Sequence, residues 1–308
     1  MKSAIVGFLI LLLFPAAPAS EYFSVAIQAS SATATTSTNP APGVGGGGTF
    51  ETVIANQRHN DEVLEVYERT ERVEIRKTGS DQNPFELHVR RAFPVGTGTY
   101  KINLSLDAKP TSPEAYRTDL EKLEKFLVAV VQRGPAQQEA YAKLEKKRKE
   151  RSDLLGASRQ AFIFTLIGHE TRGNRTLARY SMVPNPTFRP PTRTATVFTR
   201  VKGTIWVDEQ TKQLARIEGT VTEDISIALF LAKVYKGSHF MEERYEVEPG
   251  IWFPTFDQYD FDGRKFLMSF SIHERTLYTN YKRIGSPQEA LAVVRSELDK
   301  PPSGGKNP

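Results

Sequence analysis

The sequence predicts an α+β protein built on one large, curved antiparallel sheet, a half-barrel, with helices covering one face. Three observations lead to this prediction. Short segments in which apolar residues alternate recur along the chain, separated by turn residues, as in strands joined by hairpins. Helical periodicity appears only in a few segments between these groups of strands. Hydrophobic residues make up 39% and charged residues 25% of the 308 residues, which is a globular composition.

A short helix and three strands open the predicted domain. The helix is expected over residues 50–60, and the strands over residues 62–77, 86–93 and 100–106. The third strand has the clearest pattern, because alternate residues from Tyr100 to Leu106 are apolar. Gly96 and Gly98 supply the turn before it.

The hydrophobic period then changes, and residues from about 112 to 155 are predicted as an insertion of two helices. Ser112 is a helix N-cap, and it is followed by Pro113 at the first helical position. One face of this helix is aliphatic, with Leu120, Leu123, Leu127 and Val130 at helical spacing. Gly134 ends it, and Pro135 begins a second helix that is expected to end near Leu155.

The second half of the domain is predicted to be mostly strands. They are expected over residues 161–169, 175–183, 197–207, 213–222, 238–247, 251–259 and 265–277, with Asp262-Gly263 as the tight turn between the last two. Residues 225–235 carry apolar side chains at helical spacing and are predicted as a helix. Ser286 to Glu289 is a capping box that begins a final helix, with Leu291, Val294 and Leu298 facing inward.

The two ends of the chain have a different composition. Lys2 precedes an uncharged apolar run from Ala4 to Phe14, followed by Ala17-Pro18-Ala19, which is the pattern of a secretory signal peptide cleaved near Ala19. The run has 11 residues, fewer than the roughly 20 that a spanning helix needs. Residues 20–49 are rich in Ala, Ser, Thr and Gly, and they predict a disordered tether. Residues 50–300 form the single predicted domain, and 301–308 are a disordered tail.

Several kinds of site are not indicated by the sequence. The chain has no Cys, which excludes disulfides, zinc-thiolate sites and a Cys nucleophile. The net charge of +5 is a mild excess and gives no nucleic-acid footprint. No pair among the five histidines has metal-ligand spacing, and a calcium loop through Asp260 and Asp262 fails because its bidentate position is Ser269. No G-x-S-x-G occurs, so a nucleophile elbow is unsupported. Taken with the observations above, the sequence predicts no catalytic residue, metal or cofactor.

A resemblance to a known family rests on four stretches of the chain. These are IGHETRGNRTLARYSMVPNP, VKGTIWVDEQTKQLARIEG, IALFLAKVYKGS and YEVEPGIWFPTF. They resemble a group of uncharacterised secreted bacterial proteins, related in pattern to the lipoprotein-carrier superfamily (LolA-like, including the periplasmic sorting proteins). The resemblance covers residues from about 62 to 284. It implies a half-barrel sheet with a helical lid and an apolar cavity that holds acyl chains, and it brings no catalytic residues.

Four residues are candidate ligand contacts on this interpretation: Trp206, Phe230, Leu231 and Trp252. Residues 225–235 are the expected lid, so Phe230 and Leu231 would face the cavity. Ordinary core packing is the alternative for both tryptophans, because Trp is highly buried on average. The basic residues of the second inserted helix, 143–151, could attract anionic head groups, but a solvated helix face with ion pairs is favoured.

The first functional hypothesis is an exported, periplasmic or secreted binding protein, without enzymatic activity, that holds a lipid or another apolar ligand. The second is an envelope module of the same fold that binds or senses a protein or the membrane surface. The third is a secreted hydrolase that uses a carboxylate pair. Such pairs are set by the fold and not by sequence spacing, so no pair can be named among 36 acidic residues.

Overall fold

The computed structural model describes residues 47–79, 83–227, 232–265 and 268–300. The predicted signal peptide, most of the predicted tether and the tail lie outside these residues, as do Phe230 and Leu231. The first described helix begins at Gly47, inside the segment predicted as a tether.

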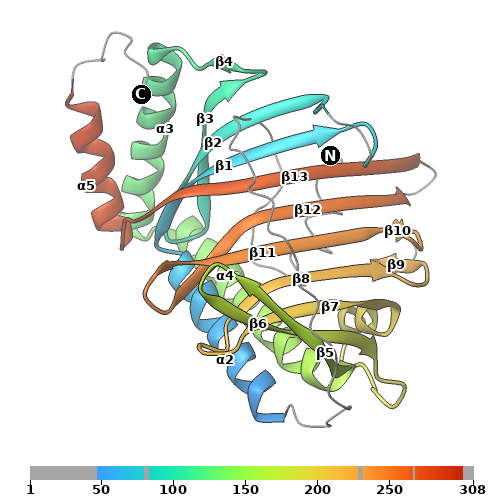
Figure 1. Ribbon diagram of the computed structural model, residues 1–308. Coiled ribbons are helices and arrows are strands. Elements are labelled where there is room, and N and C mark those ends of the chain that lie inside the picture. Colours follow the sequence, from blue (N-terminus) through green and yellow to red (C-terminus); the bar gives the residue numbers. More distant parts are fainter. Residues whose placement is uncertain (1–46, 80–82, 228–231, 266–267, 301–308) are drawn as a thin grey trace.

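One large open sheet organises the molecule, and all its described pairings are antiparallel (Figure 1). Its 13 strands follow the order β4-β3-β2-β1-β13-β12-β11-β8-β7-β6-β5, and the short strands β9 and β10 pair beside β12. The large antiparallel sheet and the α+β class are therefore as predicted. The strands are β1 (Tyr67–Arg76), β2 (Glu86–Pro94), β3 (Thr99–Leu106), β4 (Lys109–Pro110), β5 (Phe162–Arg172), β6 (Arg175–Pro184), β7 (Val201–Asp208), β8 (Leu214–Val221), β9 (Ile225–Ile227), β10 (Ala232–Val234), β11 (His239–Glu248), β12 (Ile251–Lys265) and β13 (Met268–Arg283).

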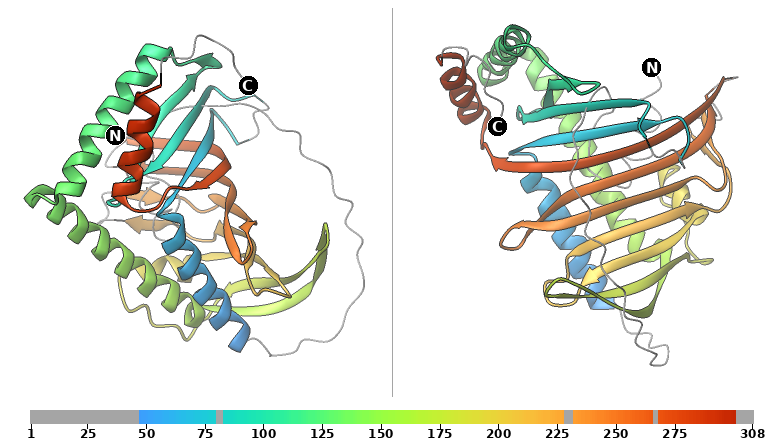
Figure 2. Two further views of the ribbon diagram at one scale, coloured as in Figure 1. Left: turned by 90° about the vertical axis from the view of Figure 1, so that its left-hand side faces the viewer. Right: turned by 45° about the horizontal axis from the view of Figure 1, so that its top comes forward.

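The helices pack against the sheet in two groups (Figure 2). They are α2 (Gly47–Leu64), α3 (Pro113–Gln132), α4 (Pro135–Ala161), the short 3₁₀ helix η1 (Thr194–Arg200) and α5 (Pro287–Leu298). We call the face of the sheet toward α2 and α4 the inner face; it carries Ile205 and Phe240, which pack in one core cluster with Phe50 of α2 and Leu154 of α4. Side chains alternate along a strand, so the residue after an inner-face residue points to the opposite, outer face, as Trp206 does after Ile205.

The second group, α3 and α5, packs against the outer face at the β2 and β3 end. Glu242 lies on the inner face, and its cross-strand neighbours on that face are, in turn, Asp257, Thr276, Val73 and His88. Arg91 is three residues after His88 on β2, so its side chain points to the outer face. The Arg91 guanidinium meets Tyr116 of α3 and Glu297 of α5 there, at 2.9 and 2.7 Å. The sequence predicts helices over one face of the sheet. Helices α2 and α4 cover the inner face in this way, whereas α3 and α5 cover part of the outer face.

The sequence signals for α3 and α5 are confirmed in detail. The Ser112 hydroxyl accepts the Ala115 N–H, and the four predicted aliphatic residues of α3 are all buried. Each such side chain contributes roughly 1.5–3 kcal/mol when removed from water. The capping box of α5 is present, with both the Ser286 and the Glu289 side chains bonded to the backbone of the first turn. Local chemistry therefore decides where these two helices begin.

The helix predicted over residues 225–235 is wrong. Residues 225–227 and 232–234 form β9 and β10, which pair with each other, and β10 also pairs with β12. The turn predicted at Asp262-Gly263 is wrong for the same reason, because β12 continues through it to Lys265. A Cβ on Gly263 would lie 2.1 Å from the Lys233 carbonyl oxygen, so this glycine permits the close approach of β10. Pairing between strands overrides an apolar pattern too short to hold a helix by itself.

Several boundaries also differ from the prediction. Helix α2 runs on to Leu64, so β1 begins at Tyr67 and not at Glu62. Helix α4 extends to Ala161, beyond the predicted end at Leu155. Residues 194–200, predicted in part as strand, form η1, which buries Val197 and Phe198 in the same core as Phe50.

Candidate functional site: an apolar cavity under α2 and α4

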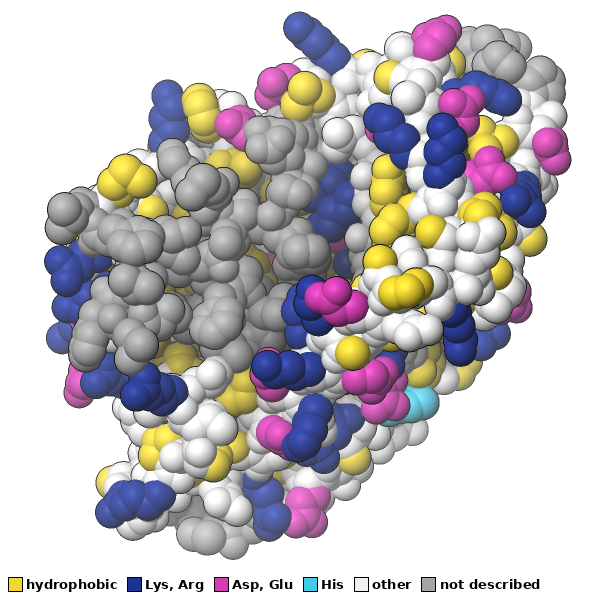
Figure 3. Space-filling view, turned by 180° about the vertical axis from the view of Figure 1, so that it is seen from behind, with side chains coloured by type: hydrophobic (Ala, Val, Ile, Leu, Met, Phe, Trp, Pro, Cys, Tyr) yellow, Lys and Arg dark blue, Asp and Glu magenta, His cyan; other side chains and the backbone are white. Residues whose placement is uncertain are grey.

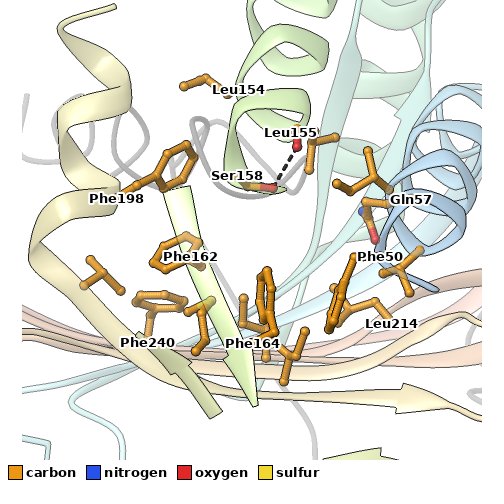
Figure 4. A pocket seen from close by; sticks show the side chains of 16 residues that line it. Phe50, Gln57, Leu154, Leu155, Ser158, Phe162, Phe164, Phe198, Leu214 and Phe240 are labelled. Carbon is orange, nitrogen blue, oxygen red and sulfur yellow. Dashed lines mark hydrogen bonds between the residues drawn. The ribbon is translucent and has the colours of Figure 1, made fainter. Parts of the chain in front are cut away.

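A cavity of about 100 Å³ lies between the inner face of the sheet and the helices α2 and α4 (Figure 4). Sixteen residues line it, and all but Gln57 and Ser158 are apolar. They are Phe50, Val53, Ile54, Gln57, Leu154, Leu155, Ser158, Phe162, Phe164, Met182, Phe198, Val201, Ile205, Leu214, Ile217 and Phe240. A site of this composition suits an apolar group.

Helical spacing on α2 and strand alternation on the sheet place these residues around one space. Phe50, Val53, Ile54 and Gln57 lie at positions i, i+3, i+4 and i+7, so they share one face of α2. On β7, Val201 and Ile205 are four apart and share the inner face.

Aromatic contacts line the end of the cavity near β5. The Phe50 and Phe164 rings stack with centroids 4.1 Å apart, and Phe162 meets Phe198 edge to face at 5.4 Å. Helix, edge strand and 3₁₀ helix thus join through rings whose geometry favours these arrangements.

Buried polar groups begin where the apolar lining ends on α2. Gln57 Nε2 donates a hydrogen bond to Asp61 Oδ1 at 2.8 Å, and both side chains are buried. Burial raises the pKa of the Asp61 carboxyl to about 7, although Arg244 of β11 and Arg151 of α4 oppose this rise. Asp61 is therefore close to half-protonated at neutral pH.

Behind Asp61, the sheet brings together two more buried carboxylates. Glu242 and Asp257 lie opposite each other on β11 and β12, and both side chains are on the inner face. Arg244 Nε donates to Glu242, and the Tyr278 hydroxyl donates to Asp257 at 2.7 Å. Burial raises the pKa of both carboxyls, and the charge of Glu242 raises that of Asp257 further.

Both predicted tryptophans lie on the outer face, away from the apolar cavity. They are buried in a separate cluster with Leu177 and Ala215. The Trp206 indole N–H donates to Glu170 at 2.8 Å, and the Arg216 guanidinium lies over its ring. Arg175 covers the Trp252 ring in the same way. The placement of Trp206 and Trp252 in the cavity is thus corrected, because each is one residue out of phase with the inner face.

Sequence reasoning missed the residues that do line the cavity. Phe50, Phe162, Phe164 and Phe240 are spread over three elements, α2, β5 and β11, and Gln57 and Asp61 appear as ordinary polar residues of a helix. The only sequence signal was the abundance of Phe, 18 in the chain.

Metal and membrane features are not seen in the described residues. Among them, no three His, Asp or Glu side chains converge in a way that could hold a metal ion. The helices described here include none long and apolar enough to cross a membrane. On α4, Lys143, Lys146 and Lys149 each pair with an acidic residue four positions away, as favoured from the sequence. Figure 3 likewise shows basic and acidic side chains interspersed on the surface seen from behind.

Comparison with known proteins adds little to this geometry. No family model and no curated protein matches the chain. Among solved structures, the chain is similar to a LolA superfamily protein from Nitrosomonas europaea, with 9% identity and a TM-score of 0.28. The similarity covers 81% of this chain and 98% of that protein. A likeness this distant carries no argument, so the fold rests on the strand pairing described above.

Proposed function

We propose that this protein is an exported, non-enzymatic binding protein that holds a lipid or another apolar ligand between α2, α4 and the inner face of the sheet. The observation that carries the proposal is the cavity itself, in which fourteen of sixteen lining residues are apolar. The sequence stretches that resemble the lipoprotein-carrier superfamily favour the same class of ligand.

The size of the cavity limits what it holds without rearrangement. A dry apolar cavity of about 150 Å³ admits a benzene-sized molecule. A cavity of about 100 Å³ therefore accepts the end of an alkyl chain or a small ring. A longer chain would need α2 and α4 to move away from the sheet, or would extend out between them.

Export is the part of the proposal that rests on the N-terminal sequence alone. Lys2, the apolar run to Phe14 and Ala17-Pro18-Ala19 support secretion to the periplasm or the medium. Sequencing the N-terminus of the exported protein tests it, and a chain beginning near Ser20 is the expected result. A mature chain that keeps Met1 would contradict export with cleavage.

Ligand binding is tested by gentle purification followed by mass spectrometry of the apolar molecules that remain bound, and by titration with a fluorescent fatty acyl probe. Ile217→Trp should fill the cavity and reduce probe binding at least about tenfold, because the added ring takes the space of the ligand. Val183→Trp is the matched control, since Val183 follows the lining residue Met182 on β6 and is 40% exposed. Equal loss in both variants, or no binding by the unaltered protein, would contradict the proposal.

A carboxylate-based hydrolase is the second candidate, because the sheet brings Glu242 and Asp257 together with raised pKa values. Paired carboxyls of this kind serve acid and base roles in glycosidases. Neither residue lines the apolar cavity, and Asp257 is 0% exposed. Turnover of a glycan or ester panel that Asp257→Asn abolishes would favour this candidate over the first.

A further inference from the structure

A second, polar pocket of about 40 Å³ lies along the contact between α2 and α4. Leu155 lines both this pocket and the apolar cavity. Gln57 borders the cavity and Asp61, one turn later on α2, borders the pocket, so the two spaces are neighbours along the same pair of helices. The residues that line the pocket are Arg58, Asp61, Glu62, Glu65, Arg148, Arg151, Ser152 and Leu155.

Two guanidinium groups in this pocket have hydrogen-bonding capacity that the described residues leave unused. The Nε atoms of Arg58 and Arg151 are buried, and no described residue accepts a hydrogen bond from either. The third arginine differs, because Arg148 forms an ion pair with Glu65 across the two helices. Arg58 and Arg151 form no such pair with any carboxylate in the described part of the chain. A buried N–H donor without an acceptor is costly, so these two groups are suited to an acceptor that enters the pocket.

The Arg58 side chain is held in place by α4. Its Nη2 donates to the Ser152 carbonyl oxygen at 2.9 Å. A Cβ on Gly156 would lie 3.0 Å from the same Nη2, so the missing side chain leaves room for the guanidinium. Gly in a helix interior costs about 1 kcal/mol relative to Ala. Gly156 therefore lowers the stability of helix α4 at the position where the Arg58 guanidinium lies against it.

Asp61 forms the wall of the pocket toward the sheet. Its Oδ2 is buried, and within the described residues it has no hydrogen-bond partner. The charged groups that face Asp61 are Arg244 and Glu242 of β11 and Arg151 of α4. The other charged residues that share its pocket are Arg58, Glu62, Glu65 and Arg148. Since its pKa is about 7, its carboxyl can donate a hydrogen bond at neutral pH when it carries its proton.

We propose that this pocket binds the carboxylate of an amphiphile whose apolar chain occupies the neighbouring cavity. The inference rests on the proposed binding of an apolar ligand and adds the head group. Arg58, Arg151 and Asp61 line the same small space. Guanidinium N–H groups and a protonated carboxyl are donors, and a carboxylate that enters this space can accept from each of the three residues. A space of about 40 Å³ is room for about three water-sized groups, which is the size of a carboxylate.

The test compares ligands whose head groups differ in charge. A carboxylate accepts hydrogen bonds from the two guanidinium groups, whereas an ammonium group has the same charge as they have and offers no acceptor. Dodecanoate, dodecanol and dodecylamine are titrated by calorimetry into the exported protein after removal of copurifying lipid. We expect the Kd for dodecanoate to be at least about tenfold lower than that for the other two, since charge-assisted hydrogen bonds are the strong ones. This comparison uses the unaltered protein and does not depend on a variant that folds.

Variants then assign the effect to the pocket. Arg58→Gln and Arg151→Gln should each raise the Kd for dodecanoate about tenfold and leave that for dodecanol unchanged. Arg159→Gln is the matched control, because Arg159 lies on α4 outside both pockets and pairs with Glu51 at the surface. An equal loss in Arg159→Gln would overturn the assignment.

The pH dependence of dodecanoate binding is an independent test of the role of Asp61. Binding of dodecanoate should weaken from pH 6 to pH 8.5, because the charged Asp61 repels the ligand, and Asp61→Asn should remove this dependence. Equal Kd values for all three amphiphiles would overturn the head-group inference and leave the proposed function standing. Absence of binding by all three would contradict both.

Discussion

Gln57 and Asp61 lie one turn apart on α2 and are joined by a 2.8 Å hydrogen bond, at the point where an apolar cavity meets a set of buried charges. Gln57 lines the cavity, and Asp61 lines the polar pocket beside it. Toward these two spaces, helix α2 therefore presents apolar residues before Gln57 and polar residues from Gln57 to Glu65 just beyond its end. An amphipathic ligand aligned with the helix would match both.

The stability of the protein should depend on the protonation of Asp61. Its pKa rises from 3.8 to about 7 on folding, so the folded state binds more protons in this range. The free energy of unfolding therefore falls as the pH rises from about 4 to 7, by up to about 4 kcal/mol from this residue. Urea unfolding of wild type and Asp61→Asn across this range measures it. The free energy of unfolding of wild type should fall relative to that of Asp61→Asn as the pH rises, and this difference should level off above pH 7. A difference that does not change with pH would contradict the raised pKa.

Glu71 should be a strong electrostatic determinant of stability. This carboxylate is 0% exposed on the inner face and accepts hydrogen bonds from Arg69 and Lys101 at 2.7 and 2.6 Å. Glu71→Gln leaves two cations without their anion, so we expect a loss of about 3 kcal/mol or more at pH 7.

The loss at Glu71 should depend on pH in a defined direction. The Lys101 and Arg69 charges lower its pKa from 4.5 to about 2 against the effect of burial, so its contribution is present above pH 4.5 and disappears as the pH falls toward 2. Denaturant unfolding at pH 7 and pH 3 checks this. Glu121→Gln is the control, because Glu121 is exposed in a pair with Arg117 and should change stability by less than about 0.5 kcal/mol.

Gly263→Ala should detach β10 from β12. The new Cβ would lie 2.1 Å from the Lys233 carbonyl oxygen, a backbone atom that cannot move aside while the pairing is kept. Hydrogen exchange of the β9 and β10 amides should become faster, while the amides of β7 and β8 keep their protection. Gly48→Ala is the control, because nothing lies within 4 Å of a Cβ there. Unchanged protection of β10 in Gly263→Ala would show that the sheet tolerates the methyl group.

Ser286→Ala should destabilise the α3 and α5 end of the molecule. It removes the Ser286 hydroxyl, which accepts the Glu289 N–H in the capping box, and a cap of this kind is worth about 1 kcal/mol. Thermal unfolding should show a correspondingly lower free energy, with faster exchange of the first-turn amides of α5. Ser286→Thr keeps a hydroxyl and should restore most of the loss. If Ala and Thr behaved alike, the cap would be without energetic effect.

The sequence by itself determined the class of the fold and the elements that carry their own signals. Ser112-Pro113 with four spaced aliphatic residues predicted α3, and the capping box at Ser286 predicted α5. Both signals act within a few residues, through backbone hydrogen bonds and one apolar stripe, so they can be found without a partner. The antiparallel sheet followed from strand alternation and hairpin turns.

Only the tertiary structure decided the state of residues 225–235 and the position of the site. The apolar pattern there fits a helix, but its described residues pair as β9 and β10, and β10 also pairs with β12, which lies outside this segment and leaves no signal within it. Trp206 and Trp252 differ from cavity residues by one step of alternation, which bulges in the sheet can shift. The contact between Asp61 and Arg244, 3.7 Å apart and on different elements, has no sequence signal at all, since it depends on how α2 lies across the inner face.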